Sequence, residues 1–179
     1  MDTRYYGIHK TPGMKDGLLL KEANCGDFQS YMNQNSNINN ALRRKWSLQI
    51  AEAVAYVHEK GIIHSNISTT NILVHQTNQT PDLVLADFGG SKCLELGLNG
   101  HLLPDDPYFD SQLTEFTSPK VDIFSLGVVI YIIMTGQYPF QTALEYRDFA
   151  YGDRVKALYK EGKFPDLSCV QFGGVIAGC

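Results

Sequence analysis

Long apolar runs are missing from this chain. The most apolar stretch, Ile123–Met134, is far shorter than the roughly 20 residues that a membrane-spanning helix needs. The first residues, Met1–Pro12, are polar and lack the apolar centre of a secretory signal. We therefore expect a cytoplasmic protein with no membrane partner, in which the apolar stretch forms a buried core helix.

Metal-binding cysteine patterns and an excess of positive charge are also missing. The 4 cysteines form no Cys-x-x-Cys pair, so neither a zinc site nor a compact disulfide framework is expected. Lys and Arg total 15 against 19 Asp and Glu, and the net charge of −4 argues against a nucleic-acid partner. With 179 residues and 44% hydrophobic content, the chain is predicted to fold as one globular domain.

Hydrophobic periodicity predicts a mainly α protein with a few short strands. Apolar residues spaced three and four apart predict a helix over 41–60, which Asn40 caps and Gly61 ends. The other expected helices cover residues 25–31, 121–134 and 146–160, and the expected strands pair 5–10 with 18–22 and 72–74 with 83–86. Residues 90–117 form a long irregular segment, and a loop of this length in a compact domain is usually functional or mobile.

Two sets of residues are expected at the surface. The basic triplet Arg43–Lys45 falls outside the apolar positions of its helix, so it is predicted to face solvent. Four histidines show no metal-ligand spacing and are predicted to be exposed: His9, His58, His75 and His101. Neither set is expected to carry chemistry.

The most informative stretch of the chain is 61–74, which reads Gly-Ile-Ile-His-Ser-Asn-Ile-Ser-Thr-Thr-Asn-Ile-Leu-Val. Within it, Asn66 follows two residues after His64, and Asn71 follows five residues after Asn66. One predicted β-hairpin later comes Asp-Phe-Gly at 87–89, and Asp-Ile-Phe-Ser-Leu-Gly at 122–127 opens the buried helix. Asp-Phe-Gly alone is a weak signal, but three motifs in this order and spacing are specific.

This arrangement resembles the eukaryotic protein kinase family over about Leu18–Phe140. The resemblance implies a mainly α (α+β) fold that corresponds to the large, C-terminal lobe of a kinase with a residual β-hairpin of the small lobe. It divides the chain into residues 1–22, a remnant of the small-lobe strands and hinge, and residues 23–179, a helical lobe truncated before its last helices. We therefore expect a single partial kinase-like domain over 1–179, or a fragment of a longer product.

The resemblance also gives roles to individual residues. Asn71 and Asp87 take the positions of the two Mg²⁺ ligands, and both are hard oxygen donors. Glu22, Ala23 and Leu73 take positions around the adenine of a nucleotide. Four residues take structural positions, with the first two stacked on each other and the last hydrogen-bonded to the 61–71 backbone: His64, Phe88, Gly89 and Asp122. A purely structural role for Asn71 and Asp87 is the alternative.

Several positions depart from the family pattern. Asn66 stands at the catalytic position of the Asp that accepts the substrate proton, and general-base catalysis contributes about 10²–10⁴-fold. Alternatively, Asn66 only holds the loop geometry. Ser68 replaces a Lys that contacts the γ-phosphate, and Ser65 replaces an Arg that pairs with a phosphorylated activation loop. Asp110 stands in place of the Glu of the Ala-Pro-Glu element and is predicted to be exposed and unpaired.

The sequence contains neither the Gly-x-Gly-x-x-Gly loop nor the Val-Ala-Ile-Lys strand of the small lobe. Binding of ATP and Mg²⁺ is therefore expected to be weak or absent. The favoured function is a catalytically impaired pseudokinase that acts in phosphorylation signalling through a protein partner, which covers the exposed hinge and adenine-floor surface. The alternative is a fragment of an ATP-dependent serine/threonine kinase.

Overall fold

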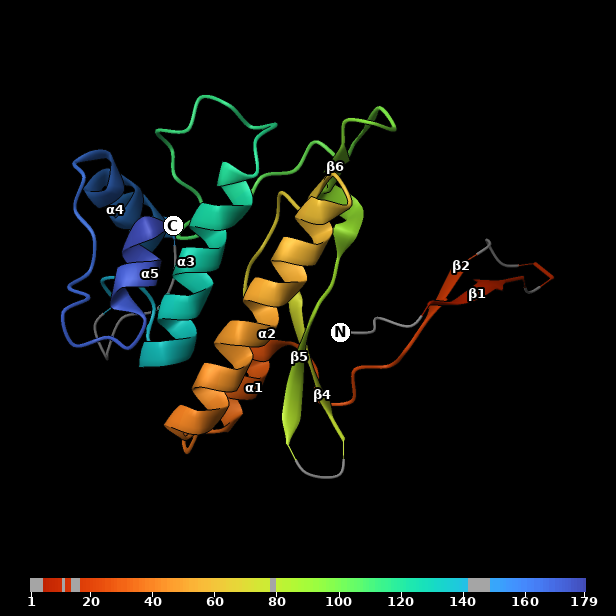
Figure 1. Ribbon diagram of the computed structural model, residues 1–179, viewed down its shortest axis with the longest axis horizontal. Coiled ribbons are helices and arrows are strands. Elements are labelled where there is room, and N and C mark those ends of the chain that lie inside the picture. The colour runs from red at the N-terminus through yellow and green to blue at the C-terminus, as the bar shows by residue number, and fades with distance from the viewer. Residues whose placement is uncertain (1–4, 11, 14–16, 78–79, 142–148) are drawn as a thin grey trace.

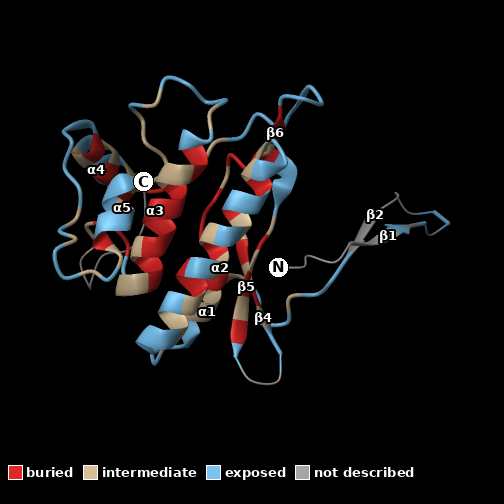
Figure 2. Ribbon diagram, in the orientation of Figure 1, coloured by how far each residue is buried: buried red, intermediate tan, exposed pale blue. Residues whose placement is uncertain are grey.

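The computed structural model of the protein describes residues 5–10, 12–13, 17–77, 80–141 and 149–179. Its centre is a pair of helices, α2 (Asn40–Glu59) and α3 (Lys120–Thr135), which lie side by side (Figure 1). An antiparallel hairpin of β4 (Ile72–Gln76) and β5 (Pro81–Leu85) packs against α2. The hydrophobic core lies between these elements, where Figure 2 shows most of the buried residues.

Helix α2 begins and ends through local chemistry. The side chain of Asn39 accepts a hydrogen bond from the N–H of Leu42 at 2.9 Å, so the cap is Asn39 and the prediction of Asn40 was wrong by one residue. Gly61 follows the last turn with a φ of +69°, a left-handed conformation that glycine adopts at low cost. The 61–71 loop therefore begins directly after the last turn of the helix.

Helix α3 is apolar on nearly every side. Its buried residues include Val129, Ile132 and Ile133, since α2 covers one side of the helix and α5 (Gly173–Gly178) another. It ends at Gly136, whose φ is +76° and whose N–H donates to the carbonyl of Ile132. The predicted core helix over 121–134 is confirmed. No described helix of the chain is both long enough and apolar enough to cross a bilayer.

Both predicted strand pairs are present. The pair β1 (Tyr5–His9) and β2 (Gly17–Leu20) is antiparallel and extends away from the helices in Figure 1. Ile8 and Leu20 on this hairpin are 59% and 53% exposed. The hairpin therefore presents apolar side chains to solvent, and an isolated two-stranded hairpin is only marginally stable in water.

The remaining elements are short. They are α1 (Phe28–Gln34), β3 (Ile62–Ile63), β6 (Lys92–Cys93), β7 (Leu98–Asn99), α4 (Phe149–Lys160) and a 3₁₀ turn at Phe88–Gly90. Strands β3, β6 and β7 form a small antiparallel sheet that sequence patterns did not predict, and neither did they predict α5. The helix expected at 25–31 begins at Phe28, after its cap Asp27. The helix expected at 146–160 is present from Phe149, and 146–148 lie outside the described residues.

The prediction of a fully solvated basic triplet was wrong for Arg43. This side chain is half-buried and donates to the carbonyl of Ile38 at 3.2 Å and to that of Ile133. Ile133 lies in the last turn of α3, whose carbonyls have no partner within the helix. Arg43 therefore ties the start of α2 to the end of α3.

The core predicts a specific cost for one substitution. Trp46 is completely buried and its indole N–H donates to the carbonyl of Pro81 at 2.9 Å, which joins α2 to β5. Trp46→Phe should lower the free energy of unfolding by about 2 kcal/mol because a buried acceptor loses its donor. Chemical denaturation measures this difference. Leu48→Ala, at a 58% exposed position of the same helix, is the control and should change it by less than about 0.5 kcal/mol. Equal effects of the two substitutions would contradict the assignment.

Candidate functional site

The 61–71 loop begins after the end of α2 and contacts the N-terminal end of α3 at Asp122. Strand β3 at its start pairs with β6, so Ile62 lies opposite Cys93 and Ile63 opposite Lys92. At its other end the loop runs into β4, and the N–H of Ala86 donates to the carbonyl of Asn71 at 2.9 Å. Both ends are therefore fixed to regular structure.

A buried carboxylate holds the middle of this loop. Asp122 is completely buried at the start of α3 and accepts hydrogen bonds from the N–H groups of His64 at 2.7 Å and Ser65 at 2.8 Å. Ser65 has a φ of +63°, a strained conformation for a residue with a side chain. The two charge-assisted bonds to Asp122 offset that strain and fix the direction in which the following residues leave.

His58 is the third partner of the same carboxylate. Its Nε2 lies 2.8 Å from Oδ2 of Asp122, and its side chain is 17% exposed, so the prediction that His58 is a surface residue was wrong. His75 is half-buried, again contrary to prediction, whereas His101 is exposed as predicted. The side chain of His9 lies outside the described residues. Spacing alone gives no signal for a histidine whose partner is 64 residues away.

His64 links the loop to the Asp-Phe-Gly turn. Its ring lies 4.7 Å from that of Phe88 between centroids, and its Nε2 lies 2.9 Å from the carbonyl of Ala86. Because Nδ1 accepts from the N–H of Asn66, the proton sits on Nε2, which donates to Ala86. Burial lowers the pKa of His64, which favours this neutral form. Phe88 is nevertheless 42% exposed, so it is stacked without being enclosed.

Asn66 and Asn71 are joined across the loop. The side-chain amide of Asn71 donates to the backbone carbonyl of Asn66 at 2.8 Å, which turns the amide oxygen of Asn71 away from that bond. Asn66 is half-buried. The polar groups that the sequence pattern singled out are therefore the side-chain amides of Asn66 and Asn71 and the carboxylate of Asp87 in the following turn.

Asp87 is exposed and strained. Its φ is +58°, and its Oδ1 accepts from the N–H of Gly89 at 3.2 Å. Because Asp87 is exposed, its carboxylate can act as an oxygen donor for a cation such as Mg²⁺. The chemistry of Asp87 and Asn71 fits such an ion, although no cluster of three or more His, Cys, Asp or Glu side chains exists in the described part of the chain.

Ser65 and Ser68 stand at positions where the resemblance to protein kinases leads us to expect an Arg and a Lys. Ser68 is buried, and its hydroxyl lies 2.9 Å from that of Thr70. Ser65 is completely buried, and its hydroxyl has no hydrogen-bond partner. Neither residue places positive charge near Asn66.

The segment proposed to lie near an adenine adds to β4. The N–H of Cys25 donates to the carbonyl of Val74 at 3.0 Å, and the N–H of Val74 donates to the carbonyl of Gly26 at 2.8 Å. Ala23 and Leu73 are half-buried and Glu22 is exposed. The structure thus brings residues 22–26 beside β4, but Leu73 is less exposed than the sequence led us to expect.

A cluster of buried hydroxyls was not foreseen. It consists of Thr69, Tyr108 and Tyr138, with Gln29 as a fourth member. We call it the hydroxyl cluster. Its members come from the 61–71 loop, the 90–117 segment, the turn after α3 and α1. No local pattern identifies such a set, since each member is ordinary in its own stretch of sequence.

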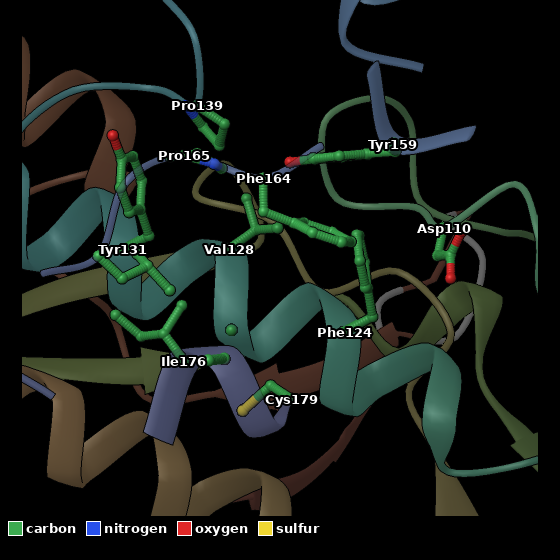
Figure 3. Close-up of a pocket in the computed structure, with 13 residues that line it drawn as sticks. Asp110, Phe124, Val128, Tyr131, Pro139, Tyr159, Phe164, Pro165, Ile176 and Cys179 are labelled. Atoms are coloured by element: carbon green, nitrogen blue, oxygen red, sulfur yellow. The ribbon is translucent and has the colours of Figure 1, made fainter. Parts of the chain in front are cut away.

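A cavity of about 310 Å³ lies elsewhere, between α3, α4 and α5 (Figure 3). Phe124 and Val128 of α3 and Tyr159 of α4 line it, and the rings of Phe124 and Tyr159 meet edge to face with centroids 5.4 Å apart. Of the residues singled out from sequence, its lining includes Phe124 and Gly127 of the 122–127 motif and Asp110, which is half-buried, contrary to the exposed position predicted. The cavity is therefore separate from the 61–71 loop and its polar groups.

Comparisons with known proteins agree on one family. The family model described as protein kinase domain matches residues 4–164. Serine/threonine-protein kinase kin-29 of Caenorhabditis briggsae is 30% identical over 138 residues, which cover 69% of this chain and 15% of that protein. The corresponding values for serine/threonine-protein kinase pim-2 of Danio rerio are 30% over 143 residues, 73% and 43%. Serine/threonine-protein kinase PKH1 of Saccharomyces cerevisiae is 29% identical over 168 residues, 84% of this chain and 21% of that protein. The chain thus spans less than half the length of each of these relatives.

The arrangement around Asp122 predicts a large effect of removing one charge. Asp122→Asn keeps the shape but turns an amide NH₂ toward one of the two N–H donors, so the free energy of unfolding should fall by about 3 kcal/mol. Hydrogen exchange at His64 and Ser65 should accelerate with it. Asp105→Asn, at an exposed aspartate, is the matched control and should have an effect below about 0.5 kcal/mol. A loss below 1 kcal/mol in Asp122→Asn would contradict the role given to this carboxylate.

Proposed function

The chain belongs to the protein kinase family, and from this premise we propose that it is a catalytically impaired kinase domain, a pseudokinase, that acts through protein binding. The observation that carries the proposal is Asn66. Its position in the loop, two residues after His64 and bonded through its carbonyl to Asn71, is that of the residue that takes the proton of the attacking hydroxyl in kinases. An amide cannot take that proton.

The surroundings of Asn66 support impaired transfer. Phosphoryl transfer depends on positioning and on neutralising the charge of the phosphates. Ser68 stands at the place of the cationic side chain and is buried against Thr70, so it supplies no charge. The protein therefore has neither the proton acceptor nor the cation at these two positions.

Residual nucleotide binding rests on Asn71 and Asp87. These two oxygen donors would hold Mg²⁺, and the ion would supply positive charge that neutralises the phosphates of ATP. Glu22, Ala23 and Leu73 would border the adenine, since residues 22–26 lie along β4. We propose that such binding is weak, because the groups described offer few contacts to the phosphates.

A protein partner is the second half of the proposal. The β1–β2 hairpin exposes Ile8 and Leu20, and it lies next along the chain to the segment beside β4. Exposed apolar side chains on a short hairpin are typical of a surface that another protein covers. In this reading the described fold corresponds to the large lobe of a kinase, with β1 and β2 belonging to the small lobe.

The second candidate is part of an active serine/threonine kinase. The specific observation in its favour is that the chain carries Asn71 and Asp87, the two oxygen donors that would hold Mg²⁺. A longer coding sequence with a Gly-x-Gly-x-x-Gly loop and a strand Lys would favour it. In that longer product, Asn66→Asp should raise the transfer rate by roughly 10²-fold or more. The absence of any gain would count against this candidate.

Nucleotide binding gives a direct test of the proposal. We expect a dissociation constant for ATP above about 1 mM, so 1 mM ATP with Mg²⁺ should stabilise the chain by less than about 0.4 kcal/mol. The melting temperature should then rise by less than about 2 °C. A differential scanning fluorimetry series with and without Mg²⁺ measures this. Asp87→Ala is the control, and a rise of more than about 5 °C that Asp87→Ala abolishes would contradict the proposal.

A further inference from the structure

We propose that the hydroxyl cluster fixes the 90–117 segment against the 61–71 loop, and that this segment needs no phosphate to become ordered. The inference rests on the proposed function in one respect, since membership of the kinase family is what identifies 90–117 as a segment that phosphorylation orders in other members. We call the contacts of the hydroxyl cluster with the segment the clamp, and all of them lie within this chain.

The segment meets the loop at its start, where β6 pairs with β3, and again at Tyr108, whose side chain reaches Thr69. The hydroxyl of Tyr108 lies 2.5 Å from that of Thr69 and 3.2 Å from that of Tyr138. The backbone N–H of Thr69 also donates to Tyr108 at 3.3 Å. Thr69, Tyr108 and Tyr138 are 1%, 5% and 5% exposed, so water does not compete for these bonds.

One assignment of protons satisfies the contacts of Thr69, and in it the 3.2 Å contact between the two tyrosine hydroxyls carries no proton. The hydroxyl of Thr69 donates to the amide oxygen of Gln29 at 3.1 Å, and it accepts from Tyr108 and from Tyr138, which lies 2.8 Å away. Burial raises the pKa of Tyr108 well above its ordinary value, with the neighbouring Tyr138 adding to the effect. The tyrosine therefore keeps the proton that it donates.

Further contacts hold the same segment without phosphate. The hydroxyl of Ser125 in α3 donates to the backbone carbonyl of Tyr108 at 2.7 Å. The ammonium of the buried Lys92 donates to the carbonyl of Phe116, near the end of the segment. Gly100 packs so closely on Gly89 that an added Cβ would lie 2.3 Å from the carbonyl oxygen of Gly89. These contacts use a hydroxyl, an ammonium that donates to a backbone carbonyl, and close packing of backbone, and none of them needs a phosphate.

The residues that would bind a phosphate group on the 90–117 segment are not arranged to do so. Ser65 occupies the position of the phosphate-binding Arg, is completely buried and carries no charge. Lys92, a buried cation within the segment, already donates to the carbonyl of Phe116 in the same segment. The hydroxyl cluster thus takes the place of a charged clamp, because it joins the same loop to the same segment with neutral groups.

Hydrogen–deuterium exchange on the full chain, read at residues 104–113, tests the clamp. The reporters are the N–H groups of Tyr108 and Leu113, which donate to the carbonyls of Asp105 and Asp110. Thr69→Val keeps the shape of the side chain but removes the hydroxyl, and should speed exchange there by about tenfold, as expected when buried donors lose their acceptor. Thr69→Ser keeps the hydroxyl and should change exchange by less than about threefold. Tyr56→Phe, at a 61% exposed tyrosine, should change nothing.

The result that would overturn the clamp is equal exchange in Thr69→Val and Thr69→Ser. If Thr69→Val does not fold while Thr69→Ser does, the need for the hydroxyl is shown by stability instead, and Tyr138→Phe supplies the exchange comparison. A merely structural role would raise exchange over the whole chain, whereas the clamp predicts a change concentrated in 104–113.

Phosphate dependence is tested on the same sample. Protein from eukaryotic expression, measured before and after phosphatase treatment, should show the same exchange in 104–113 within about twofold. Faster exchange after phosphatase would overturn the proposal. These readouts involve no catalysis, so a finding that the chain transfers phosphate would refute the proposed function and leave the clamp standing.

Discussion

The site depends on the hydrogen bonds that the carboxylate of Asp122 accepts. This carboxylate is buried at the start of α3 and receives two backbone N–H groups of the 61–71 loop together with the ring of His58. None of these bonds involves the side chain of residue 65 or 66. These bonds are therefore independent of the side chains at positions 65 and 66, and they can persist when those side chains change.

That independence explains how a kinase-like frame accommodates Asn66 and Ser65. Asn71 still closes the loop through the carbonyl of Asn66, and the hydroxyl cluster ties the loop to the 90–117 segment. The frame is thus maintained by the carboxylate of Asp122, the side-chain amide of Asn71 and the hydroxyl cluster. At positions 66 and 65 the loop carries an amide side chain and a completely buried hydroxyl, and neither is charged.

Sequence patterns predicted the long elements and the order of the motifs. Helices α2 and α3 were predictable because their apolar residues recur along many turns, and His64 and Asp122 because their spacing is diagnostic. The two-residue strands β3, β6 and β7 were not, since only their mutual pairing makes them strands. The hydroxyl cluster and the role of His58 were missed for the same reason, because each depends on partners that are distant along the chain.

The rate of phosphoryl transfer tests the central claim most directly, namely that the frame persists without the proton acceptor. The purified chain is incubated with γ-labelled ATP, Mg²⁺ and a mixture of peptides with Ser, Thr or Tyr acceptors, beside Asp87→Ala. The account predicts that both proteins label the peptides at the same background rate. A wild-type rate in the ordinary range of kinases, about 1–100 s⁻¹, that falls to background in Asp87→Ala would contradict it.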